Sequence, residues 1–228
     1  IGDAAPFTDV DTVQRFLKRG VQIGSDVTVN TANESYVLWQ WLLGDSATTG
    51  STTSPAGSIA STTIVADTGH FSVGSYTGNN TDNSTVGHGL GGAPEMIIVH
   101  NLDRSVFGAV WHTDGGGATH TADFARNTPF SANDTKFGGS DADLPTANVF
   151  KIGTHVELNA DGESFVFYAL RSIPGVCKLG TYTGNGDAAG PYIDLGFKPA
   201  FFMAKQSSAV ENWVMLDNKR PHYNPTGG

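Results

Sequence analysis

The chain has 228 residues, of which 39% are hydrophobic and 15% charged, and its 29 glycines suit short strands joined by tight turns. Its formal net charge is −9, from 13 basic and 22 acidic residues, so binding to nucleic acid is not expected, because phosphate contacts depend on Lys and Arg. A single cysteine, Cys177, excludes an internal disulfide. The sequence contains no run of about 18 apolar residues, so membrane insertion is not expected.

The first candidate element is TDVDTVQRFLKRG, residues 8–20. Asp near its start and Lys and Arg near its end are typical of a short helix, whereas its length also suits an edge strand. The sequence leaves both interpretations open.

The next segment occurs twice. Residues 21–43, VQIGSDVTVNTANESYVLWQWLL, recur as FKIGTHVELNADGESFVFYALRS at residues 150–172, and we name this segment unit B. Apolar residues occupy both alternations of its second half, which predicts a strand buried on both faces. Turn residues precede that strand in each copy, and Asp161-Gly162 is a strong hairpin signal. Each unit B is therefore predicted to be a hairpin.

Residues 44–69 follow the first unit B. They are rich in Ser, Thr and Gly and show no apolar periodicity. This composition predicts an exposed loop or linker.

A second segment, unit A, also occurs twice. FSVGSYTGNN at residues 71–80 matches CKLGTYTGNG at residues 177–186, and the match resumes without a gap over residues 90–113 and 195–218. Apolar runs that begin after a proline, separated by polar turns, predict two or three antiparallel strands in each copy. We expect the two copies to superpose strand for strand.

The phrase Tyr-Thr-Gly-Asn lies at the start of both copies of unit A. We interpret it as a strand end followed by a turn, repeated because each copy must reverse direction at the same point. Tyr76 and Tyr182 should pack inward, while Gly78 and Gly184 should adopt backbone conformations that are costly for other residues.

The order B-A-B-A predicts an all-β chain folded as an antiparallel β-sandwich, because its short predicted strands are separated by turn signals about every eight to twelve residues. One unit A followed by a unit B makes a complete module, which leaves the first unit B and the second unit A without partners. Unpartnered strand edges are normally covered, so these halves should pair, either within one chain or head to tail between copies. Self-association as an oligomer or filament is the favoured outcome. The predicted divisions are residues 1–43, 44–69, 71–173 and 177–228.

One polar cluster could bind a metal. WHTDGGGATHTADFAR carries two histidines and two carboxylates, the donors that divalent metals prefer, at His112, Asp114, His120 and Asp123. The alternative is a solvated polar loop. Calcium is a further candidate, because the loops NADGE and TGNGDAAG gather oxygen-bearing side chains around glycines, although neither has the spacing of a twelve-residue calcium loop.

Aromatic side chains could stack on sugars. Trp39, Trp41, Tyr168 and Trp213 lie in strands predicted to be buried, so Trp111 and Tyr223 are the candidates for a glycan contact. Catalysis is not expected, because the sequence contains no G-x-S-x-G motif and its glutamates stand singly near strands.

The phrases AGSIASTTIVADTGHFSVGSYTGN, VGHGLGGAPEMIIVHN and KLGTYTGNGDAAGPYIDLGFKPAFFMAK follow one another with a DGESFVFYAL-type strand between the last two. In this order they resemble a repeated β-domain of large structural proteins of tailed bacteriophages, especially aquatic ones, which are described as tail-fibre-like or lectin-like. The resemblance covers residues 8–224.

The resemblance implies a jelly-roll or concanavalin-like sandwich in a non-enzymatic virion protein of the extracellular particle. Its implied partners are other virion proteins, copies of itself and host-surface glycans. The alternatives are a head decoration or fibre protein, a secreted subunit of a non-viral extracellular filament, and a polysaccharide-active enzyme built on a lectin-like sandwich.

Overall fold

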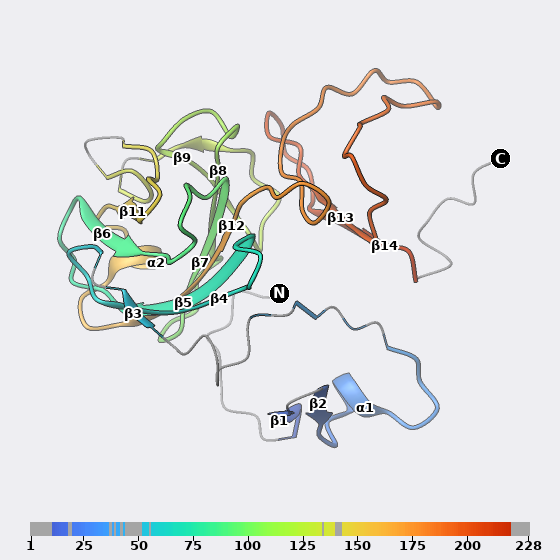
Figure 1. The fold of residues 1–228 in the computed structure, drawn as a ribbon, viewed down its shortest axis with the longest axis horizontal. Coiled ribbons are helices and arrows are strands. Elements are labelled where there is room, and N and C mark those ends of the chain that lie inside the picture. The colour runs from blue at the N-terminus through green and yellow to red at the C-terminus, as the bar shows by residue number, and fades with distance from the viewer. Residues whose placement is uncertain are drawn as a thin grey trace.

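The structure is a computed structural model and describes residues 11–17, 20–36, 38, 40, 41, 43, 52–54, 56–133, 135–139 and 143–219. Its elements, in chain order, are β1 (Val13–Leu17), β2 (Gly20–Ile23), α1 (Val27–Asn30), β3 (Thr52–Ser54), β4 (Ser61–Val65), β5 (Phe71–Thr77), β6 (Ser84–Gly87), β7 (Met96–Asn101), β8 (Ala109–His112), β9 (His120–Asp123), β10 (Ser131–Ala132), β11 (Val149–Ile152), α2 (Val156–Asn159), β12 (Ser164–Leu170), β13 (Phe201–Ala204) and β14 (Val214–Asp217) (Figure 1). The predicted all-β class is confirmed.

The main layer is an eight-stranded antiparallel sheet with the order β10-β9-β8-β7-β12-β5-β4-β3. Its central strand is β12, which pairs with β5 on one side and with β7 on the other. Phe167 of β12 lies opposite Gly74 and Val99. A strand from unit B therefore joins two strands of unit A that would otherwise be separate.

The second layer is smaller. It consists of β6 paired with β11, extended by bridges from Ile59 to Val86 and from Phe137 to Ile152. The figure shows β6, β11 and α2 together beside the large sheet (Figure 1). The two layers enclose one apolar core, as in other β-sandwiches, formed chiefly by Ile59, Tyr76, Val86, Leu90, Ile97, Val99, Ala109, Trp111, Phe137, Phe150, Ile152, Leu158, Phe165, Phe167 and Ala169. We call residues 52–172 the complete sandwich.

The central strand β12 shows how alternation positions the core. Phe165, Phe167 and Ala169 face the second layer and are fully buried, whereas Tyr168, on the opposite face, is 36% exposed. The prediction that this strand is buried on both faces is thus wrong for its outer face. The outer face of the sheet is only partly covered.

Two predictions about loops need correction. Unit B is not a hairpin, because its residues Val156–Asn159 form the short helix α2, which sends β11 into the small layer and β12 into the large sheet. Residues 44–69 are not simply a linker, since their described part contains β3 and β4, and β4 pairs with β5 along its length. Ser and Thr fit these positions because Ser61 and Thr63 are buried and the Ser61 hydroxyl donates a hydrogen bond to the Gly87 carbonyl.

The two unit A copies share the β7–β8 arrangement. In the complete sandwich Met96 lies opposite His112 and Val99 opposite Ala109. In the second copy the equivalent pairs, Phe201 with Asp217 and Ala204 with Val214, join β13 to β14 in the same register. The expected superposition is confirmed for these strands. It does not extend to β5, because residues 177–183 form no strand.

The N-terminal segment forms a strand rather than a helix. β1 pairs with β2 in an antiparallel hairpin, so the edge-strand interpretation of residues 8–20 is correct over the part that the structure describes. The helices α1 and α2 have four residues each, and among the described residues no helix is long and apolar enough to span a bilayer.

Candidate functional site

The predicted glycan contact Trp111 lies in β8 and is only 2% exposed. Its ring belongs to the core between the layers, and its indole N–H donates to the Gly117 carbonyl at 3.2 Å. Trp111 therefore cannot stack on a sugar, and this prediction is wrong. Its position opposite Ile97, an inward-facing residue of β7, turns it inward. The other predicted contact, Tyr223, lies outside the described residues.

Two aromatic rings that the sequence placed inside are exposed instead. Trp41 is 52% and Tyr168 is 36% exposed. The Tyr168 ring stacks on Phe71 with 6.2 Å between centroids, and Trp41 contacts the same Phe71 ring at 5.9 Å. These rings form an aromatic surface on the outer face of the large sheet, which we call the outer aromatic face.

The four predicted metal ligands do not form a metal site. His112 and His120 lie at neighbouring positions on β8 and β9, on the outer face, whereas Asp123 lies on the inner face. Asp114 uses its backbone N–H to donate to the His112 ring at 3.1 Å. The described part of the chain contains no group of three or more His, Cys, Asp or Glu side chains suited to a metal ion. The pleat separates the carboxylate of Asp123 from the histidines.

Asp123 belongs to a buried ion network that the sequence did not predict. Lys136 places its ammonium 2.9 Å from Asp123 Oδ1 and 2.6 Å from Glu157 Oε2. His155 lies next to the same Glu157 oxygen, at 3.9 Å. Asp123 comes from β9 in the large sheet and Glu157 from α2 beside the small layer. Lys136 thus links the two layers of the complete sandwich.

The environment of the network keeps its histidine neutral. Partial burial lowers the pKa of His155, and the positive charge of Lys136 lowers this pKa further, while Glu157 and Asp123 oppose the shift. The His155 ring nitrogen Nδ1 accepts the Glu157 backbone N–H at 3.3 Å, which caps the first turn of α2. The ammonium is therefore balanced by two carboxylates, an arrangement suited to holding two layers together.

The first unit B lacks this network although it has the same local structure. Gly24 donates to the Thr12 carbonyl at 2.7 Å, as Gly153 donates to the Lys136 carbonyl at 2.6 Å, so Thr12 is the counterpart of Lys136. Thr28 stands where the second copy has Glu157. The fold of this segment does not require the ions, which makes the network a specific feature of the complete sandwich.

The repeated Tyr-Thr-Gly-Asn phrase differs between its copies. Tyr76 is 5% exposed and donates to the Leu158 carbonyl at 2.6 Å, whereas Tyr182 is 53% exposed. Neither Gly78 nor Gly184 has a positive φ, so the predicted strained backbone is wrong at both. Gly78 is required for a different reason: a Cβ there would lie 2.2 Å from the Ala160 carbonyl oxygen of unit B.

The loops considered for calcium use their polar groups internally. Asn159 donates to the carbonyls of Thr81 and Gly153 and accepts the Asn79 N–H, and Glu163 binds Arg104 and Asn101. In the second loop Asn185 accepts the N–H of Asp187 in a local turn. These contacts give Asn159, Glu163 and Asn185 a structural role in their turns.

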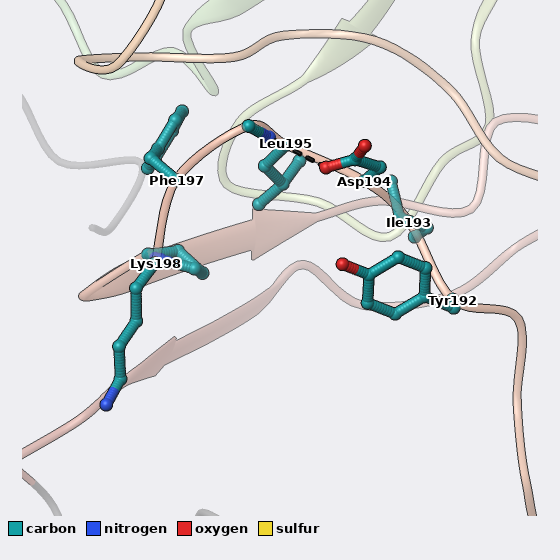
Figure 2. A pocket seen from close by; sticks show the side chains of 8 residues that line it. Tyr192, Ile193, Asp194, Leu195, Phe197 and Lys198 are labelled. Atoms are coloured by element: carbon teal, nitrogen blue, oxygen red, sulfur yellow. Dashed lines mark hydrogen bonds between the residues drawn. The ribbon is translucent and has the colours of Figure 1, made fainter.

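A hollow lies in the second unit A. It is lined by the consecutive residues 192–199, with Leu195 and Phe197 half-buried and Asp194 accepting the Gly196 N–H at 2.9 Å (Figure 2). Leu195 is the counterpart of Leu90, which belongs to the core of the complete sandwich. The hollow therefore contains the counterpart of a position that is buried in the complete sandwich.

Comparison with protein families supplies one match. The sequence profile of DUF7483, described as a domain of unknown function, matches residues 3–228. The chain belongs to this family. No curated protein and no solved structure matches it. The DUF7483 profile spans both copies of each unit, so the B-A-B-A order lies within a single family domain.

The DUF7483 chain uses its other carboxylates near strands in structural contacts. Glu95 accepts both the backbone N–H and the hydroxyl of Ser172, at 3.1 and 2.6 Å, and so fixes the end of β12. Glu163 binds Arg104 at the opposite end of the same strand. Each carboxylate thus anchors a strand end.

Proposed function

We propose that this chain is a non-enzymatic structural and adhesive protein of a bacteriophage virion, in a tail-fibre-like assembly. The observation that carries the proposal is the repetition of unit A at one register, in β7–β8 and in β13–β14. Repetition of a sandwich unit extends a surface without adding a reactive centre, and it is typical of fibre proteins. The resemblance of the unit A and unit B phrases to tailed-phage structural proteins supports the same assignment.

The use of the polar side chains supports a structural role. Asp123, Lys136 and Glu157 join the two layers, and Glu95 and Glu163 hold the ends of β12. An enzyme that cleaves polysaccharide would instead present paired carboxylates to a substrate. We accordingly assign these groups to stability rather than to catalysis.

The location can be tested on virus particles. Antibodies raised against the purified 228-residue chain should decorate one morphological feature of the phage in immunogold electron microscopy, and peptides of the chain should appear in the mass spectrum of gradient-purified virions. Labelling of a tail fibre supports the proposal. Labelling of the capsid would instead assign the chain to a head decoration protein. Absence of the chain from purified particles would refute a virion role.

The outer aromatic face is the candidate contact for host-surface glycans. Trp41 and Tyr168 present partly exposed rings side by side around Phe71, and sugars stack on such rings through their apolar C–H faces. A glycan array should show binding that Tyr168→Ala weakens at least about tenfold, which corresponds to the roughly 1.4 kcal/mol expected of one lost aromatic contact. Tyr192→Ala, a change at a highly exposed tyrosine outside this face, is the matched control. Release of shorter sugars from the array would favour the enzyme instead.

A further inference from the structure

The second unit A lacks the strand that completes the first. In the complete sandwich β12 lies between β5 and β7, with paired residues along its whole length on both sides. In the second copy, residues 177–183 correspond to β5 and form no strand, and β13, the counterpart of β7, pairs with β14 alone among the described strands. Among the described strands, the second unit A therefore has no counterpart of β12 to join these two segments.

The first unit B contains the sequence that matches this strand. Residues 35–43 are the counterparts of β12 and its C-terminal end, and their described members belong to no helix or strand. Leu38 is 63% exposed, although its counterpart Phe167 is fully buried. The apolar character of a core strand is present in the sequence, but the described residues Tyr36 and Leu38 are exposed.

The local structure before this segment is already that of a complete module. α1 begins after Asp26 as α2 begins after His155. The Asn30 amide donates to the Gly24 carbonyl at 2.7 Å, as Asn159 donates to Gly153 at 2.8 Å. Asn33 has a φ of 66°, and its counterpart Gly162 has a φ of 71°. The turn that directs the chain into β12 thus also exists ahead of residue 35.

Most of the other core positions have apolar counterparts that are not buried, whereas Gln40 and Thr31 stand where the complete sandwich has Ala169 and Ala160. Some of these apolar counterparts lie in the first unit B, namely Val21, Ile23, Val29, Tyr36 and Leu38. The others lie in the second unit A, namely Tyr182, Leu195, Phe202 and Leu216. Together these side chains would supply a second, smaller apolar core. Their exposure leaves a large hydrophobic driving force for the two halves to associate.

One contact already joins the two halves in register. Trp41 packs edge-on against Phe201, with 6.1 Å between ring centroids. The counterparts of these residues are Leu170 and Met96, which are directly paired across β12 and β7. The contact therefore brings together the two residues that pairing in the complete sandwich would make neighbours, and it does so within one chain.

We propose that residues 35–43 insert as a strand between residues 177–183 and β13 of the same chain. The two incomplete halves, residues 11–43 and 177–219, then form a second sandwich into which the complete sandwich is inserted. Pairing within the chain is favoured because the covalent connection raises the effective concentration of the two halves. This inference is independent of the virion location, since it concerns the fold of one protomer.

A cysteine cross-link tests the register of this strand. In the complete sandwich Phe167 lies opposite Val99, so Leu38 should lie opposite Ala204 with Cα atoms about 4.5–5.5 Å apart, within disulfide reach. The variant Leu38→Cys/Ala204→Cys, in a Cys177→Ala background, should form an intrachain disulfide under mild oxidation. Leu38→Cys/Met203→Cys is the control, because a shift of one residue points the second side chain to the opposite face.

The cross-link is read by non-reducing electrophoresis and peptide mass mapping. A monomeric band carrying the Leu38–Ala204 disulfide, formed at least about tenfold faster than in the control, supports the proposal. A disulfide-linked dimer would assign the strand to a second copy and overturn pairing within one chain. Equal rates in the two variants, or no disulfide, would also overturn it.

Hydrogen exchange on the unmodified chain provides a test that needs no variant. Amides of residues 35–43 and 177–183 should exchange at least about 100-fold more slowly than unstructured amides, as in a buried strand. Their protection should approach that of Ser164–Leu170 in β12. Exchange of both segments at the unprotected rate would refute the second sandwich even if a cross-link could be trapped.

Discussion

The buried ion network gives a prediction that tests whether it stabilises the contact between the two layers. Lys136→Met removes an ammonium that lies within 3 Å of two carboxylates, Asp123 at 2.9 Å and Glu157 at 2.6 Å. All three side chains are largely buried, so the two carboxylates left behind lack both their partner and full hydration. Breaking a buried ion pair in this way costs about 3–5 kcal/mol.

That loss is large relative to the stability of a domain, which is about 5–15 kcal/mol. Urea unfolding followed by tryptophan fluorescence, to which the buried Trp111 contributes, should show a midpoint that falls markedly in Lys136→Met. Arg104→Met is the matched control, because it breaks an ion pair with Glu163 at an exposed arginine, where such pairs contribute little.

A triple variant isolates the cause. Adding Asp123→Asn and Glu157→Gln to Lys136→Met removes the unpaired charges while keeping the side-chain shapes, so most of the lost stability should return. If Lys136→Met left the urea midpoint unchanged, or if the triple variant were no more stable than the single one, the network would not hold the layers together and our reasoning would be refuted.

Two further predictions concern single positions in the complete sandwich. Burial lowers the pKa of His88 in the folded chain, where its ring binds the Thr146 carbonyl at 3.1 Å. Below the ordinary pKa of 6.5 the unfolded chain therefore takes up a proton that the folded chain does not. The contribution of His88 to the free energy of unfolding is complete above that pH and is lost on acidification. His88→Gln should reduce the slope of unfolding free energy against pH between 7.5 and 5.5 by up to about 1.4 kcal/mol per unit, and an unchanged slope would contradict this assignment. Gly78→Ala should destabilise the sandwich by about 1–3 kcal/mol, because its Cβ would lie 2.2 Å from the Ala160 carbonyl oxygen. Gly190→Ala, with open space around the added carbon, is the control, and equal urea midpoints for the two variants would show that unit B does not approach Gly78 so closely.

The equivalence of the two unit A copies could be predicted because it depends on local patterns. Both copies have apolar runs after a proline and polar turns of matching length, and β7–β8 and β13–β14 share one register as a result. The unit B hairpin could not be predicted in the same way. Its turn signal at Asp161-Gly162 is real, with Gly162 at a φ of 71°, but the helical turn before it sends the two strands into different layers.

The direction of the aromatic side chains depends on tertiary pairing. Alternation along β8 and β12 shows that neighbouring residues face opposite ways, but it does not show which parity meets the second layer. Trp111 turned out to be inside and Tyr168 outside, the reverse of the prediction. The reason is that Trp111 lies opposite the inward residue Ile97 of β7, which in turn lies opposite the inward residue Ala169 of β12.

The ion network could not be predicted because its members are brought together only by the fold. Asp123 closes β9, Lys136 precedes a bridge of the small layer, and Glu157 lies in the first turn of α2. No spacing rule connects these three positions in the sequence. The grouping of Asp123 with the nearby histidines followed proximity in the chain, whereas the pleat of β9 turns this carboxylate to the inner face.

The two glycines of the repeated phrase connect these observations to the second sandwich. Gly78 is needed because the backbone of unit B, at Ala160, passes where a side chain would lie. Gly184 is its counterpart, yet no described atom lies within 4 Å of the position that its Cβ would occupy. A glycine in that setting gains nothing from close packing and has no positive φ to accommodate. The proposed insertion of residues 35–43 beside residues 177–183 explains the glycine at position 184. The backbone at Thr31, the counterpart of Ala160, would then lie close to Gly184, as Ala160 lies close to Gly78. The same insertion would bury Tyr182 as Tyr76 is buried, so the inward packing expected of both tyrosines depends on a partner strand and not on the phrase itself.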